Sequence, residues 1–222
     1  SSFRPHLEPF SLASYCEDQG YQQIAQILRM ENIPSFDLEF FENPQEIREF
    51  RYMDTTVSGL EALSVCLKLK DLWMPRNRLE DLSHLRELTN LRTLSLSNNR
   101  IHSLEPLAGL LSLGYLDLSG NPVTSEELSH LRKLKRLGSL LLNDTLVDDV
   151  SPLQGYRGSS LELTGLPMLK NAEVLKTRTR LQALRLDLVT ERALGIGEMV
   201  PWLNIRVEYN GIVELTNAAY YG

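Results

Sequence analysis

The chain has 222 residues, of which 42% are hydrophobic and 23% charged, enough to bury a continuous core as one or two folded units. Its formal net charge of −6 would repel a phosphate backbone on average, so a nucleic acid is disfavoured as a partner. No apolar run approaches the roughly 18 residues that a transmembrane helix needs, so we expect no membrane insertion.

The first 44 residues lack the periodic leucines found further along the chain. Apolar side chains recur there at helical spacing, between Gly20 and Pro34: Tyr21, Ile24, Ala25, Ile27 and Leu28. We therefore predict that residues 7–44 are mainly helical. Residues 1–44 would form an N-terminal cap, because the open end of a stack of repeats needs a cover.

From residue 45 onward, leucines recur with a regular period. Segments that begin at Leu69, Leu91 and Leu113 align without gaps on the pattern LxxLxLxxNxL, with their asparagines 22 residues apart. A less regular repeat precedes them, and four repeats of altered length follow, with sixth positions at Leu142, Leu163, Leu186 and Val207. The sequence thus predicts about eight repeats over residues 45–212 and a C-terminal tail over residues 213–222.

Apolar and polar residues alternate within each repeat, as in Leu94-Ser95-Leu96, and this alternation is the period of a β-strand. Such a short strand cannot bury its leucines alone, so the repeats must stack and join their leucines in one core. The asparagine after each strand can satisfy backbone groups of the turn. We therefore interpret four asparagines as structural: Asn77, Asn99, Asn121 and Asn210.

This pattern resembles the leucine-rich-repeat family, and within it the short 22-residue intracellular type of the phosphatase-regulatory subunit, the spliceosomal A-prime protein and the dynein-associated light chain. The resemblance implies an α/β solenoid with a curved parallel sheet on its concave face, helices and turns on its convex face, and a helical N-terminal cap. Leu166 and Val189 stand where the family places asparagine, so we expect irregular turns there.

A longer repeat contains the segment 125–136, in which Leu128, Leu131 and Leu134 recur every third residue. We predict a capped amphipathic helix on the convex side. The helix ends in a basic run, Arg132, Lys133, Lys135 and Arg136. We interpret this run as a solvated helix face rather than a contact for an anion.

The sequence contains no pattern that is typical of catalysis or of cofactor binding. It has no His-Glu-x-x-His motif, no nucleophile elbow and no phosphate-binding glycine loop. Its two cysteines, Cys16 and Cys66, are far apart, which favours a reducing compartment. We therefore expect a non-enzymatic protein without cofactor or metal, located in the cytoplasm or alternatively in the nucleus.

Strand residues that point away from the leucine core form the candidate binding surface. Trp73, Met53, Tyr115 and Leu141 stand out, because an exposed sheet face gains nothing from presenting large apolar groups to water. Since Trp, Tyr and Arg dominate binding hot spots, we expect Trp73 to anchor a partner together with Arg51, Met53, Arg76 and Tyr115. The alternative is that the N-terminal cap or a loop covers Trp73 and makes it part of the core.

Acidic positions follow farther along the same face, and they would suit a basic segment of a partner. They are Asp117, Asp144, Glu162 and Asp187, with Arg185 as an exception. The candidate partner-binding residues are therefore Arg51, Met53, Trp73, Arg76, Tyr115, Asp117, Leu141, Asp144, Glu162 and Arg185.

The pattern predicts a protein-protein interaction scaffold that binds a protein or peptide on its concave face, as a regulatory, targeting or recognition module. Two alternatives stay open. One is an RNA-associated factor of the spliceosomal A-prime type, whose binding would weaken steeply with salt. The other is a substrate-recognition domain excised from a larger enzyme.

Overall fold

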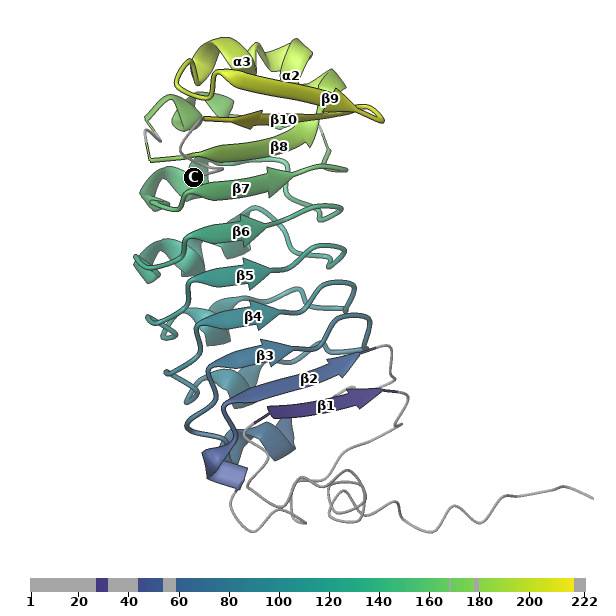
Figure 1. The fold of residues 1–222 in the computed structure, drawn as a ribbon, viewed down its shortest axis with the longest axis vertical. Coiled ribbons are helices and arrows are strands. Elements are labelled where there is room, and N and C mark those ends of the chain that lie inside the picture. The colour runs from purple at the N-terminus through teal and green to yellow at the C-terminus, as the bar shows by residue number, and fades with distance from the viewer. Residues whose placement is uncertain (1–26, 32–43, 54–58, 168, 178–179, 218–222) are drawn as a thin grey trace, which may run out of the picture.

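The computed structural model describes residues 27–31, 44–53, 59–167, 169–177 and 180–217, which form a solenoid with one strand per turn (Figure 1). The strands join in one sheet of ten, in the order β1-β2-β3-β4-β5-β6-β7-β8-β10-β9. Their bounds are β1 Ile27–Glu31, β2 Glu49–Met53, β3 Asp71–Trp73, β4 Thr93–Ser95, β5 Tyr115–Asp117, β6 Ser139–Leu141, β7 Ser160–Leu163, β8 Ala183–Asp187, β9 Ile205–Tyr209 and β10 Ile212–Thr216.

Between β2 and β9, short helices on the other side of the core return the chain from the end of one strand to the start of the next. In the described ranges, seven are 3₁₀ helices: η1 Pro44–Glu46, η2 Glu61–Val65, η3 Ser83–Leu85, η4 Glu105–Leu107, η5 Glu126–Lys133, η6 Ser151–Gly155 and η7 Ala172–Thr177. Two α-helices, α2 Leu188–Leu194 and α3 Ile196–Met199, lie at the C-terminal end. None of the helices described is long and apolar enough to cross a membrane.

The core is a continuous column of leucines between the sheet and the helices. The parallel pairing of strands β2 to β8 aligns one inward residue from each strand, all of them buried: Phe50, Leu72, Leu94, Leu116, Leu140, Leu161 and Leu184. This stacking confirms the predicted leucine-rich-repeat solenoid with an open parallel sheet. The outer face of the sheet, away from this column, is the concave face.

A ladder of buried asparagines ties successive turns together. Asn99 Nδ2 donates to the carbonyl of Leu96 in its own repeat (2.8 Å) and to that of Met74 in the preceding one (2.9 Å). Its Oδ1 accepts the backbone N–H of Leu79 (3.1 Å). Asn77 and Asn121 bond the preceding repeat in the same way, so these three predicted structural roles are confirmed.

The prediction for the N-terminal segment was wrong at residues 27–31, which form strand β1 and not a helix. Ile27 pairs with Glu49, an offset of 22 residues, so β1 continues the repeat register. Without β1, the edge of β2 would carry unpaired backbone groups. Pairing with these groups favours a strand at residues 27–31, although the apolar residues there have helical spacing. The predicted cap also includes Pro44, the first residue of η1, and residues 1–26 and 32–43 lie outside the described part of the chain.

The predicted eighth repeat and C-terminal tail are also corrected. Residues 212–216 form strand β10, which lies antiparallel between β8 and β9, and Val207 of β9 is 45% exposed rather than buried. Asn210 and Gly211 make the two-residue turn between β9 and β10, both with positive φ (48° and 78°). Asn210 is therefore a hairpin residue and not a rung of the asparagine ladder.

The predicted amphipathic helix is the 3₁₀ helix η5, because leucines at every third position match three residues per turn. Ser125 does not cap it. Its hydroxyl instead bonds the next repeat, where it accepts the backbone N–H groups of Asp148 and Asp149 (3.0 and 2.9 Å).

We predict that Asn99→Ala lowers the free energy of unfolding by about 2–4 kcal/mol, because buried carbonyl and N–H groups in two repeats lose their partner. Urea unfolding followed by circular dichroism measures this loss. The neighbouring exposed Arg100→Ala serves as the control and should change stability little. Equal effects of the two substitutions would contradict the structural role of the ladder.

Candidate functional site

Two rows of side chains run along the concave face, one from each outward position of the strands. The first row passes through Glu49, Asp71, Thr93, Tyr115, Ser139 and Ser160, and the second through Arg51, Trp73, Ser95, Asp117, Leu141, Glu162 and Arg185. Adjacent strands lie about 4.8 Å apart. The sheet therefore places side by side residues that are some 22 positions apart in the sequence.

Arg51, Trp73 and Tyr115, here called the aromatic cluster, are in contact on this face. The Arg51 guanidinium carbon lies 5.0 Å from the centre of the Trp73 ring, a cation–π geometry. The Trp73 and Tyr115 ring centres are 5.8 Å apart, with the planes tilted by 32°. Arg51 is also held by Glu49, to which its Nε donates.

Small residues on β4 allow the two rings to meet although they lie two strands apart. Thr93 and Ser95 occupy the outward positions of β4, between Trp73 on β3 and Tyr115 on β5. Ser95 is buried at 3% exposure, and its hydroxyl lies 3.3 Å from an Asp117 carboxylate oxygen. A larger side chain at either position would compete for the space that the rings occupy.

Trp73 is half-buried. It is thus neither a freely exposed side chain nor part of the core, and the described contacts on it come from Arg51 and Tyr115. Partial burial raises the pKa of Tyr115 to about 12, and the negative charges of Asp117 and Glu162 act in the same direction. The Tyr115 hydroxyl therefore stays neutral at physiological pH.

A second group of polar residues, the Arg185 network, occupies the C-terminal half of the face. Arg185 Nη1 donates to Glu162 (3.1 Å), Nη2 donates to the Tyr209 hydroxyl, and Nε lies 3.9 Å from a Glu214 oxygen. Asn143 extends the network by donating to the other Glu162 oxygen (2.8 Å). The carboxylate of Glu162 is therefore paired with groups of the protein itself, and this pairing interrupts the predicted acidic strip.

The structure places Arg76 and Asp144 in turns rather than on strands, which corrects their expected position. Both occupy the eighth position of a repeat, where the backbone is left-handed: Arg76 (φ 56°), Asn98 (56°), Gly120 (68°), Asp144 (54°) and Gly165 (66°). Glycine, asparagine and aspartate tolerate this conformation, whereas arginine adopts it at a cost. Arg76 and Asp144 are both exposed at the rim of the concave face.

The other predicted residues are distributed along the second row. Met53 ends β2, but its side chain lies outside the described part of the chain. Asp117 accepts the backbone N–H of Ser119 (3.0 Å), and half-buried Leu141 lies between Asp117 and Glu162 in the register. Glu214 was missed by the sequence reasoning, because nothing in the repeat pattern indicates an inserted antiparallel strand.

The concave face carries apolar and charged side chains. Among the residues that the structure describes, no group of three or more His, Cys, Asp or Glu side chains could hold a metal ion. The aromatic cluster provides apolar surface beside Arg51, whose charge is paired with Glu49, and the charges of the Arg185 network likewise have partners inside the molecule. Such surfaces bind ligands by shape and charge.

One parallel strand per repeat of some 22 residues, backed by 3₁₀ helices and an asparagine ladder, defines a leucine-rich-repeat solenoid. The chain therefore has the leucine-rich-repeat fold. A family model described as leucine-rich repeats (two copies) matches residues 89–128, which include β4 and β5. No curated protein sequence matches the chain significantly.

Two solved structures with similar folds come from Listeria monocytogenes. Internalin C2 aligns with a TM-score of 0.58 and 23% identity, over 72% of this chain and 80% of its own. Internalin InlF aligns with a TM-score of 0.57 and 22% identity over 72% of this chain, which spans about half (53%) of its length. At this level of identity the likeness establishes the fold alone.

We predict a pH dependence of stability from Tyr115. Since its pKa rises from an ordinary value of about 10 to about 12 on folding, the unfolded chain loses this proton first. The contribution of neutral Tyr115 to the free energy of unfolding is thus complete below pH 10 and is lost as the pH rises toward 12. Urea unfolding between pH 9 and pH 11 should show wild type losing stability faster than Tyr115→Phe, whereas parallel curves would contradict the raised pKa.

Proposed function

We propose that this chain is a protein-interaction module that holds a protein or peptide partner on the N-terminal half of its concave face, with the aromatic cluster as the anchor. The supporting observation is the contact between Arg51, Trp73 and Tyr115 on an outward sheet face. Solenoids of this kind present extended concave surfaces for binding. Trp, Tyr and Arg are also the residue types that contribute most to binding energy at interfaces.

The cluster is arranged before a partner arrives, which lowers the entropic cost of binding. Trp73 contacts both Arg51 and Tyr115, and Arg51 in turn donates to Glu49. Side chains that are already ordered lose less rotamer freedom when a partner covers them. A partner with an apolar or aromatic side chain would complement the accessible part of the cluster, because Arg51 is already paired with Glu49.

The turn at Arg76 supports the same location. Arg76 follows Trp73 by three residues and has φ 56°, where later repeats use Asn98, Gly120, Asp144 and Gly165. An arginine in the left-handed region costs roughly 1–2 kcal/mol relative to glycine. Backbone strain of this kind is concentrated at functional sites, and the strained residue lies next to the aromatic cluster.

The proposed role is that of a regulatory, targeting or recognition module without chemistry of its own. The concave face supplies apolar contact at one end and an internally paired ionic network at the other. A partner seated over the Arg185 network would have to compete with Glu162 and Tyr209 for the guanidinium. We therefore assign the main contribution to affinity to the aromatic cluster.

The test compares wild type with Trp73→Ala as bait for partners in extracts of the native cell, quantified by mass spectrometry. The matched control is Leu111→Ala, which truncates a large exposed side chain (55% exposed) between η4 and β5, off the sheet. We predict that the partner captured by wild type and by Leu111→Ala falls at least about tenfold with Trp73→Ala. Equal capture by a folded Trp73→Ala variant would contradict the proposal.

A second readout tests direct contact, because Trp73 and Trp202 are the two tryptophans of the chain. In a Trp202→Phe variant, Trp73 is the sole tryptophan. The captured partner should then shift its fluorescence emission to shorter wavelength as the ring loses water. An unchanged spectrum at saturating partner would place the contact elsewhere.

A further inference from the structure

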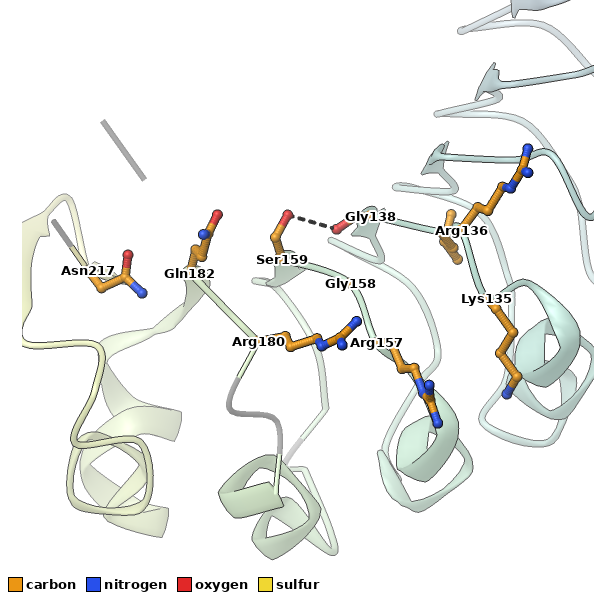
Figure 2. A pocket seen from close by; sticks show the side chains of 10 residues that line it. Lys135, Arg136, Gly138, Arg157, Gly158, Ser159, Arg180, Gln182 and Asn217 are labelled. Atoms are coloured by element: carbon orange, nitrogen blue, oxygen red, sulfur yellow. Dashed lines mark hydrogen bonds between the residues drawn. The ribbon is translucent and has the colours of Figure 1, made fainter. Parts of the chain in front are cut away.

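A groove of about 390 Å³ lies at the edge of the sheet where strands β6, β7 and β8 begin, separate from the aromatic cluster. Four cationic side chains line it: Lys135, Arg136, Arg157 and Arg180 (Figure 2). We call it the basic groove. No carboxylate is found among the described residues that line it. Lys135 and Arg136 follow helix η5, which ends at Lys133, and this corrects their interpretation as part of a solvated helix face.

The repeat itself assembles three of these cations. Arg136, Arg157 and Arg180 each stand three residues before the first residue of a strand, namely Ser139, Ser160 and Ala183. Those three residues are partners in the register of β6, β7 and β8. The arginines are 21 and 23 positions apart in the sequence, and the sheet stacks them at the same position of successive turns.

The four cationic side chains do not all point the same way. In Figure 2, Arg180 points toward Arg157, Lys135 descends on the far side of Arg157, and Arg136 projects in the opposite direction to Lys135. All four are exposed. A ligand that lies along Arg180, Arg157 and Lys135 would thus meet three of the four cations.

These cations have no ionic partners among the residues that the structure describes, in contrast to three cations of earlier repeats. Lys68 occupies the position equivalent to Arg136, and it is paired with Glu46 (2.6 Å). Arg86 and Arg100 are likewise paired, with Glu105 and Glu80. In a chain with a net charge of −6, four cations together without a local carboxylate form a distinct positive site.

We propose that the basic groove binds an acidic segment of a protein partner, with carboxylates of that segment paired to Arg157, Arg180 and Lys135. Guanidinium groups suit carboxylates, because their forked N–H donors can bond both oxygens. Three successive turns span two steps of about 4.8 Å, close to the length of three extended residues. A short run of glutamate or aspartate therefore matches the groove in charge and in size.

The groove fits a protein segment better than a nucleic acid. Single-stranded nucleic acids are usually held by aromatic side chains that stack on the bases, together with cations for the phosphates. No aromatic residue is found among the described residues that line this groove. The overall negative charge of the chain also opposes a long phosphate backbone more than it opposes a short peptide.

Fluorescence anisotropy with labelled peptides tests the proposal on the full chain. The probe is an octapeptide of alternating Ser and Glu, and the neutral comparison is the octapeptide of alternating Ser and Gln. We predict that the acidic peptide binds and the neutral one does not, and that raising salt from 50 to 200 mM weakens binding. The double variant Arg157→Gln/Arg180→Gln should reduce affinity about tenfold or more.

The control is Arg86→Gln/Arg100→Gln, which removes the same charge from exposed positions of other repeats and should bind like wild type. Equal binding of the acidic and neutral peptides, or equal binding by wild type and Arg157→Gln/Arg180→Gln, would overturn the proposal. A single-stranded RNA pentamer with four phosphates is the competing ligand. If it bound more tightly than the acidic peptide and lost affinity in Arg157→Gln/Arg180→Gln, the choice of a protein segment would be wrong.

Discussion

The stacking of each short strand on its neighbours is the constraint on which the rest of this molecule depends. A strand of three residues such as β4 cannot shield Leu94 from water, yet Leu94 is fully buried because β3 and β5 lie on either side of it. Stability is thus shared between adjacent repeats rather than held within any one of them. The asparagine ladder works on the same principle, since Asn99 bonds carbonyls of two repeats.

The same stacking creates both surfaces to which we assign binding. Once the leucines are aligned in the core, every other position of a repeat is aligned as well. Trp73 and Tyr115 come together across β4 by this route, and so do Arg157 and Arg180 at the sheet edge. One face therefore gains an apolar anchor and one edge gains a positive groove, although the residues involved lie far apart in the sequence.

The sequence was sufficient for the regular repeats and insufficient for the ends. Leucines at a fixed period can only be buried together by stacking, so the register of β3 to β8 followed. At Asn210 two patterns coincide, since it fits the repeat consensus but is followed by Gly211, and Asn-Gly is the strongest signal for a two-residue hairpin. The contact of Arg51 with Trp73 could be predicted from the spacing of the strands. The Arg185 network includes Glu214 of β10, and the leucine period does not predict that strand.

The central claim is that leucines face a shared core while the alternate side chains face outward, and one pair of neighbours in β6 tests it directly. Leu140 is fully buried and Ser139 is half-buried on the other face. Urea unfolding should show that Leu140→Ala lowers the free energy of unfolding by about 3 kcal/mol or more. Ser139→Ala should change it by less than about 0.5 kcal/mol. Comparable losses from the two substitutions would contradict the account.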